Sequence, residues 1–256
     1  MQDNFETLLY QGTTKEITLP SGRVITIREL NGTDEGILSN QSLAEQNKNT
    51  AAFISGLVVA DPGAKGGKPT VEQVMQWPVN DKYYALMAIR RLSYGDIVKF
   101  PYICPRCEKR STFKEDLSLF DYSPEEENPE IKRSTYNIKK YPTQTNEVTL
   151  TLSSGKVIKY NLLNTESEKV KLDTPEDARN INLDFTIRGL KILMNGEYTR
   201  VHHFGIFGPS DLRELRKSLT DNDLTFTPLT LVACSCGNKE YHNILSVSDF
   251  FYPTEI

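Results

Sequence analysis

Four cysteines in two distant pairs constrain the fold of this chain more than any other feature. The first pair lies in Cys-Pro-Arg-Cys at residues 104–107, the second in Cys-Ser-Cys-Gly at residues 234–237, and the chain has no other cysteine. Each pair stands between two runs with the character of β-strands, so each is expected to occupy a tight turn. Such a turn folds the chain back far enough to bring two sulfurs onto one metal ion.

The two pairs together predict one shared site with the ligands Cys104, Cys107, Cys234 and Cys236. Four thiolates close a tetrahedron and leave no position for water, so such a site stabilises structure and performs no chemistry. Zinc is the expected ion. Four thiolates also suit iron, but an isolated structural site gives iron no redox role. The Cys-x-Cys spacing of the second pair is the weaker half of the pattern, because the shorter spacing strains the chelate.

Other roles for these residues stay open from sequence alone. Cys234 and Cys236 are compatible with small buried apolar side chains, a common role of cysteine. Disulfides are a second alternative, although nothing else in the sequence indicates an oxidising compartment. A third is that His242, or the adjacent His202 and His203, replaces one thiolate as a ligand.

Composition narrows the class of protein. The 256 residues carry a net charge of −4, and 38% of them are hydrophobic, which is ordinary for a globular chain. The acidic balance argues against a nucleic-acid-binding body. No apolar run approaches the ~20 residues of a membrane helix, and the polar start of the chain does not look like a secretory signal. We therefore expect no membrane and no nucleic acid among its partners, and synthesis in a reducing cytoplasm.

The second half of the chain repeats the first. Apolar and polar residues alternate on both sides of Ser-Gly at residues 17–28, which predicts a β-hairpin, and residues 150–160 repeat this pattern. Cys234 follows Cys104 at a spacing of 130 residues. A shared offset of roughly 130 residues between several features indicates a duplicated unit. The expected fold is therefore α+β, with two diverged copies of a hairpin–helices–knuckle unit joined by a zinc-ribbon-like four-cysteine site.

The chain is therefore expected to consist of four parts: an N-terminal arm (1–15), a first repeat (16–123), an acidic, proline-containing linker (124–145) and a second repeat (146–256). Helices are expected near residues 34–47, 49–60, 70–76, 82–93 and 211–219. The helix at 211–219 is matched to the short one at 70–76. On that match, the second copy lacks a full counterpart of the helix at 82–93.

No catalytic site is assigned. The patterns of metalloproteases, serine hydrolases, phosphate-binding loops and dinucleotide-binding loops are absent. The chain has only three histidines, which limits acid–base chemistry at neutral pH. We expect that the protein is not an enzyme.

The first half of the chain does carry a family resemblance. Its residues run in a fixed order: Leu-Pro-Ser-Gly at 19–22, Arg-Glu-Leu-Asn-Gly at 28–32, Asp-Lys-Tyr-Tyr-Ala-Leu at 81–86, Ile-Arg-Arg-Leu-Ser-Tyr-Gly-Asp at 89–96, and then the first cysteine pair. This order resembles the baseplate hub proteins of T-even-type bacteriophages. The resemblance covers residues 15–122 well and the second copy weakly.

The resemblance implies a structural component of a contractile-tail baseplate, at or near the hub, that contributes protein–protein contacts in tail assembly. It implies other tail proteins as partners, several copies in a symmetric assembly, and a place in the virion tail. It brings no catalytic residues and transfers only the metal-ligand role of the four cysteines. The alternative is a zinc-ribbon adaptor that binds nucleic acid or a polymerase.

Overall fold

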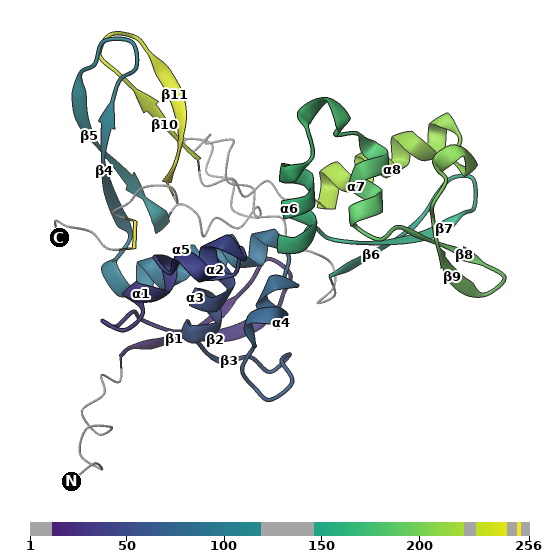
Figure 1. Cartoon of the computed structure of the whole chain (residues 1–256), viewed down its shortest axis with the longest axis horizontal. Coiled ribbons are helices and arrows are strands. Elements are labelled where there is room, and N and C mark those ends of the chain that lie inside the picture. The colour runs from purple at the N-terminus through teal and green to yellow at the C-terminus, as the bar shows by residue number, and fades with distance from the viewer. Residues whose placement is uncertain (1–11, 119–145, 223–228, 245–249, 252–256) are drawn as a thin grey trace.

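The structure is a computed structural model that describes residues 12–118, 146–222, 229–244 and 250–251. Most of the expected N-terminal arm (1–11) and the whole expected linker (124–145) lie outside the described residues. Figure 1 shows two lobes of helices and strands, and beside them two paired hairpins that point away from the helices of the first lobe.

The first lobe is a small antiparallel sheet covered by helices. Its strands β1 (Thr14–Thr18), β2 (Val24–Arg28) and β3 (Val58–Ala60) pair in that order. Alternation in β1 and β2 turns Ile17, Ile25 and Ile27 into the core. The helices are α1 (Glu35–Leu38), α2 (Gln41–Glu45), α3 (Asn49–Leu57), α4 (Val71–Met75) and α5 (Val79–Tyr94).

Two helix boundaries differ from those expected. The run at 34–47 is split into α1 and α2, because Asn40 caps a new helix by accepting from the backbone N–H of Leu43. The expected helix at 49–60 ends at Leu57, and its continuation Val58–Ala60, which begins with two β-branched valines, becomes the third strand of the sheet. The short helix α4 begins as expected, with a complete capping box between Thr70 and Gln73.

The second lobe has the same kind of elements. Strands β6 (Glu147–Thr151), β7 (Val157–Asn161), β8 (Lys191–Met194) and β9 (Glu197–Arg200) form one antiparallel sheet in chain order. Its helices are α6 (Thr165–Asp173), α7 (Ile181–Ile187) and α8 (Pro209–Asn222), with short 3-10 turns at Glu176–Ala178 and Phe204–Ile206. The hairpin β6–β7 lies where the sequence pattern predicts it. Strands β8 and β9 were not anticipated.

The paired hairpins carry the cysteines. Strands β4 (Ile97–Ile103) and β5 (Arg110–Asp116) form one hairpin, and β10 (Leu229–Ala233) and β11 (Lys239–Asn243) form the other. We call these four strands the ribbon. Their buried side chains, among them Phe100, Tyr102 and Val232, belong to the core of the first lobe.

The hydrophobic cores do not follow the order of the chain, because the last strands pack with the first lobe and not with the second. The first core also includes Phe250 and Phe251, and the ring of Phe251 lies 5.0 Å from that of Phe53. The second core is built from residues between Leu152 and Leu219. The division at 146–256 stays a prediction about chain order, whereas the last strands of the chain pack against the first lobe.

The two hairpin turns use the same backbone hydrogen bonds. In the first, Leu19 N–H donates to Arg23 O and Gly22 N–H donates to Leu19 O, both at 2.8 Å. In the second, Leu152 N–H donates to Lys156 O and Gly155 N–H to Leu152 O, again at 2.8 Å. Gly22 and Gly155 have φ of 86° and 82°, a left-handed conformation that favours glycine.

A buried aspartate in the first turn of a long helix contacts each hairpin turn. Asp81 of α5 accepts from Ser21 N–H at 2.9 Å, and Asp211 of α8 accepts from Lys156 Nζ at 2.7 Å. Each lobe therefore has one long helix that contacts its hairpin turn through a buried aspartate: α5 in the first lobe and α8 in the second. The match of residues 211–219 to the helix at 70–76, and the missing full counterpart of the helix at 82–93, stay predictions. What the structure adds is that α8 continues to Asn222, three residues beyond the expected end.

The two aspartates have opposite pKa shifts. Lys156 and a hydrogen bond with Ser154 hold the pKa of Asp211 below its usual value. Burial raises the pKa of Asp81 to about 6, against the lowering effect of Ser21. The nearby Arg23 lowers the pKa of Asp81 least among these groups. Its guanidinium is paired instead with the buried Asp61, at 2.9 Å.

Asp81→Asn is expected to stabilise the protein at pH 7 and to have little effect at pH 4. Since the pKa of about 6 in the folded protein exceeds the ordinary aspartate pKa of 3.8, the folded state binds the proton more tightly. Stability from this group is therefore full below pH 4 and lost as pH rises through 6. The difference between the two pKa values corresponds to a destabilisation of at most about 3 kcal/mol at neutral pH, which Asp81→Asn would remove. Urea unfolding of both proteins at pH 4, 5, 6 and 7 checks it, and an equal effect at all four values contradicts it.

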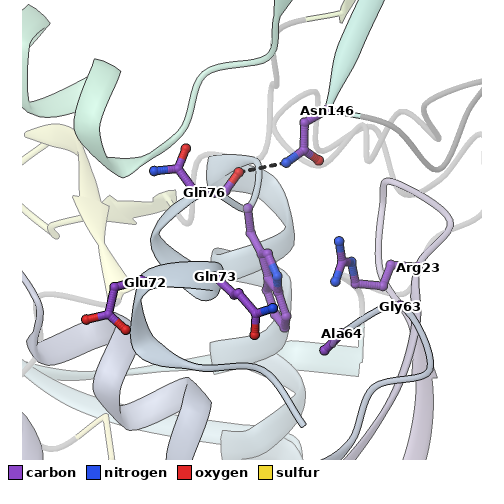
Figure 2. A pocket seen from close by; sticks show the side chains of 8 residues that line it. Arg23, Gly63, Ala64, Glu72, Gln73, Gln76 and Asn146 are labelled. Atoms are coloured by element: carbon purple, nitrogen blue, oxygen red, sulfur yellow. Dashed lines mark hydrogen bonds between the residues drawn. The ribbon is translucent and has the colours of Figure 1, made fainter. Parts of the chain in front are cut away.

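The lobes meet at the start of α5. Val79 N–H donates to Leu163 O at 2.9 Å, and Asn146 Nδ2 donates to Gln76 O at 2.7 Å (Figure 2). A pocket of about 410 Å³ opens beside this contact. Its lining residues are Arg23, Gly63, Ala64, Glu72, Gln73, Gln76, Trp77 and Asn146. Arg23, Gln73 and Gln76 are already engaged by Asp61, Thr70 and Asn164.

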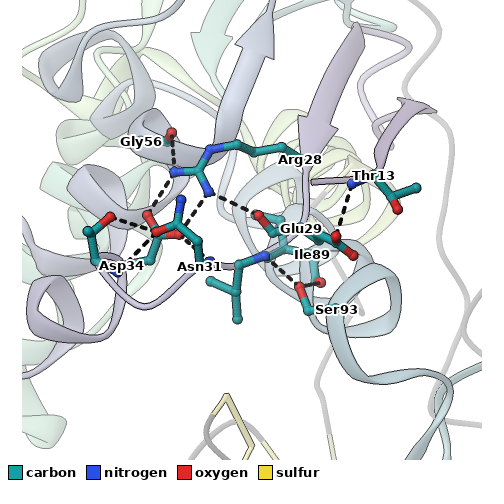
Figure 3. Close-up of polar contacts among 10 residues, drawn as sticks. Thr13, Arg28, Glu29, Asn31, Asp34, Gly56, Ile89 and Ser93 are labelled. Carbon is teal, nitrogen blue, oxygen red and sulfur yellow. Dashed lines mark hydrogen bonds and ion pairs between the residues drawn. The ribbon is translucent and has the colours of Figure 1, made fainter. Parts of the chain in front are cut away.

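The segment after β2 is held by a compact polar network (Figure 3). Arg28 makes two hydrogen bonds of 2.8 Å with the carboxylate of Asp34, and its guanidinium also donates to the backbone carbonyls of Glu29 and Gly56. Asn31 N–H donates to the same carboxylate at 2.8 Å. The network fixes the turn from the sheet into α1, and it uses residues of the Arg-Glu-Leu-Asn-Gly motif.

Candidate metal centre

The first cysteine knuckle is a tight turn between β4 and β5. Cys104 N–H donates to Lys109 O at 3.1 Å, and Glu108 N–H donates to Cys104 O at 2.8 Å. Glu108 has φ of 57°, the left-handed conformation that a non-glycine residue adopts only under constraint. The turn thereby places Cys104 and Cys107 on the same side of the hairpin end.

The second knuckle reproduces this turn with one residue fewer between its cysteines. Cys234 N–H donates to Asn238 O at 2.8 Å, and Gly237 N–H donates to Cys234 O at 2.9 Å. Gly237 has φ of 87°, so in both knuckles the residue after the second cysteine is left-handed. The Cys-x-Cys spacing is therefore compatible with the same closure of the turn.

The two knuckles bring all four sulfurs together. Cys104 Sγ lies 3.6 Å from Cys236 Sγ, and Cys107 Sγ lies 3.6 Å from Cys234 Sγ. All four Sγ atoms lie within 4.8 Å of one another. Four sulfurs at about 2.3 Å from a tetrahedral zinc ion would lie roughly 3.8 Å apart. The donor set and its spacing fit one metal ion bound by both knuckles.

The polypeptide favours thiolates at the two buried positions. Burial opposes ionisation of Cys104, but the backbone N–H groups of Arg106 and Cys107, with the neighbouring sulfurs, lower its pKa to about 6. The backbone N–H of Cys236 likewise lowers the pKa of Cys234.

The pKa of Cys107 shows how strongly the four sulfurs affect one another. A backbone hydrogen bond from Lys109 favours its thiolate, but the sulfurs of Cys236 and Cys234 and burial raise the pKa of Cys107 to about 12. Four sulfurs this close repel one another when they are all ionised, and a divalent cation removes that repulsion.

Contacts around the sulfurs hold the two hairpins in register. Lys109 Nζ donates to Ser235 Oγ at 3.0 Å, from one knuckle to the other, and Asn238 Nδ2 lies 3.4 Å from Tyr102 OH. Deeper in the ribbon, the hydroxyl of Thr230 donates to the buried carboxylate of Glu115. The sequence did not single out these residues, because they are polar positions in ordinary strands and only the pairing of distant hairpins brings them together.

The alternative ligands lie elsewhere. The ring of His242 stacks on Phe100 at 5.3 Å, and His242 is not part of the sulfur cluster. His202 and His203 are exposed in the second lobe. The cysteines are free in this structure, and their closest cross-hairpin sulfurs are at 3.6 Å, well beyond the ~2.05 Å of a disulfide. Cys234 is buried, but it faces the other sulfurs and not only apolar side chains.

The chain was compared with known protein families and with known proteins. The family model described as "T4 bacteriophage base plate protein" matches residues 13–159, more than half of the chain. The chain belongs to this family of baseplate proteins. The family resemblance seen in the sequence is thereby confirmed. No curated protein and no solved structure gives a significant match.

The matched region of this baseplate protein runs from β1 to β7. It includes the Arg28 network and Cys104 and Cys107, and it stops before the second knuckle. Among the described residues, no helix has both the length and the apolar character needed to cross a bilayer.

Proposed function

We propose that the protein is a structural component of the phage tail baseplate, at or near its hub, and that one zinc ion bound by Cys104, Cys107, Cys234 and Cys236 locks its ribbon. Family membership over residues 13–159 carries the first part, and the four converging sulfurs support the second. Bound zinc supplies a structural cross-link. The cysteines would hold it, and no position would be left for a reacting water.

The same proposal includes a duplicated architecture. Both lobes contain a hairpin closed by the same turn and a third strand beside its second strand. In both, a long helix places a buried aspartate near that turn. Each half of the chain ends in a two-cysteine knuckle, and two half-sites make one complete site. The metal would then fasten the end of the second copy to the first.

In this role the protein acts through contacts with other tail proteins, in several copies within the virion tail, and it is not an enzyme. The closed sulfur cluster offers no substrate position, which supports a structural function over metal-dependent catalysis. Burial of the two halves of the ribbon against one lobe gives the rigid body that such contacts require.

Purified tails test this proposal. We expect mass spectrometry of tails, and of the assembly intermediates that precede them, to find the protein at a fixed stoichiometry to the other baseplate proteins. Phage grown without it would make no complete tails. Its absence from tails and from every tail-assembly intermediate would contradict the proposal, whatever the metal content of the isolated chain.

A further inference from the structure

One face of the hairpin β4–β5 points away from the ribbon core. The strand register sets Lys99 opposite Lys114 and Ile103 opposite Arg110, and these side chains are exposed. The aromatic residues of both strands point the other way, into the core with His242. We call the exposed set Ile97, Lys99, Ile103, Arg110 and Lys114 the basic face.

The central pair of the basic face is unfavourable in the isolated chain. Like charges directly opposite each other on an antiparallel pair destabilise it. Among the described residues, Lys99, Arg110 and Lys114 make no ion pair within 4.0 Å. The carboxylate on the same face, that of Asp116 opposite Ile97, accepts instead from the N–H and the hydroxyl of Ser118. An anion bound to this face from outside would reduce the repulsion between the two lysines and stabilise the strand pair.

The surroundings indicate what kind of anion fits. Ile97 and Ile103 are 48% and 56% exposed at the two ends of the face. Apolar ends around a cationic centre match a protein surface that alternates acidic and apolar side chains. A single-stranded nucleic acid is a poorer match because Phe100, Tyr102 and Phe113 are turned inward and offer no stacking platform.

We propose that the basic face is the docking surface for an acidic segment of another baseplate protein. Every copy of the chain carries the same net charge of −4, so a second copy of the protein would be repelled overall. The proposal rests on the proposed function for the identity of the partner. The chemistry of the surface stands apart from it.

A binding experiment tests the chemistry on the full, metal-loaded chain. Fluorescently labelled poly-L-glutamate at low salt is the probe, with a single-stranded DNA of similar length as its comparison. We expect Lys99→Glu/Lys114→Glu to bind the polypeptide roughly tenfold more weakly than the unmodified protein. The control Lys65→Glu/Lys68→Glu makes the same charge change in an exposed loop and should bind as the unmodified protein does. Equal losses in both variants, or tighter binding of DNA than of poly-L-glutamate, overturn the proposal.

The single variant Lys114→Glu separates docking from folding. It places an opposite charge across from Lys99, so the melting temperature should stay the same or rise while binding of poly-L-glutamate falls. A fall in both would show that the lysine acts through the stability of the hairpin, and it would contradict the proposal.

Competition during assembly tests the partner. Equal amounts of unmodified and variant chains, distinguished by mass, are supplied while tails form. We expect Lys99→Glu/Lys114→Glu to enter tails at least about fivefold less often than the unmodified chain, and Lys65→Glu/Lys68→Glu to enter equally. Equal entry of both variants overturns the docking proposal. If even the unmodified chain fails to enter, the proposed function fails, and the poly-L-glutamate result still decides the chemistry of the face.

Discussion

Cys104→Ser is expected to abolish tight metal binding and to unfold the ribbon. Cys104 is buried at the junction of both hairpins and belongs to the core of the first lobe. A serine hydroxyl is a poor ligand for zinc, so the remaining three thiolates would lose the closed tetrahedral site. Because the metal binds only the folded chain, its binding free energy is folding free energy.

The expected loss is at least about 3 kcal/mol, since structural zinc contributes much more than this in isolated finger peptides. It corresponds to roughly 6–12 °C in the melting temperature for a chain of this size. Elemental analysis, thermal unfolding and hydrogen exchange measure it. The amides of β4, β5, β10 and β11 should lose protection, while those of the separate second core should keep it.

Ser235→Ala is the matched control. Ser235 lies between the two cysteines of its knuckle, is exposed and accepts one hydrogen bond from Lys109. It should keep the metal and lose no more than about 1 kcal/mol. Full metal content and unchanged stability in Cys104→Ser would contradict the four-cysteine assignment.

Arg28→Leu is the second substitution with a large expected effect. It removes both hydrogen bonds to Asp34, whose side chain is only 3% exposed. A buried carboxylate without its partner costs about 3–5 kcal/mol. The free energy of unfolding in urea should fall by this amount, with residues 29–38 among the first to lose hydrogen-exchange protection.

Two further variants show whether the missing partner causes the loss. Arg28→Leu/Asp34→Leu should be destabilised by clearly less than the sum of its single substitutions, because removing both charges leaves no buried ion. Arg110→Leu, at an exposed position of β5, should change stability by no more than about 0.5 kcal/mol. A loss in Arg28→Leu no larger than in Arg110→Leu would show that the network has no stabilising role.

Local patterns predicted most of the elements that position the candidate site. The alternation around Ser-Gly predicted the hairpins β1–β2 and β6–β7. The cysteine pairs predicted the turns of the other two hairpins, whose flanking strands end or begin within three residues of a cysteine. These features depend on neighbours a few residues apart, so one sequence is enough to find them. The helix α5 was also found from its periodic apolar residues, although it begins three residues earlier than expected.

Features that depend on distant pairing were missed. Nothing local shows that Phe251 packs on Phe53, or that Thr230 reaches Glu115. The role of Asp211 was overlooked because its contact with Lys156 joins residues that lie 55 positions apart in the chain. Strands β8 and β9 were missed because β9 is exposed along its whole length and has no alternating pattern.

X-ray absorption spectroscopy at the zinc edge, on the purified full chain with its metal content measured, tests the central claim most directly. We expect one zinc per chain, with four sulfur neighbours at about 2.3 Å. A chain without metal whose cysteines form disulfides, or a zinc ion with nitrogen or oxygen neighbours in place of sulfur, would contradict a ribbon closed by one ion between the two knuckles.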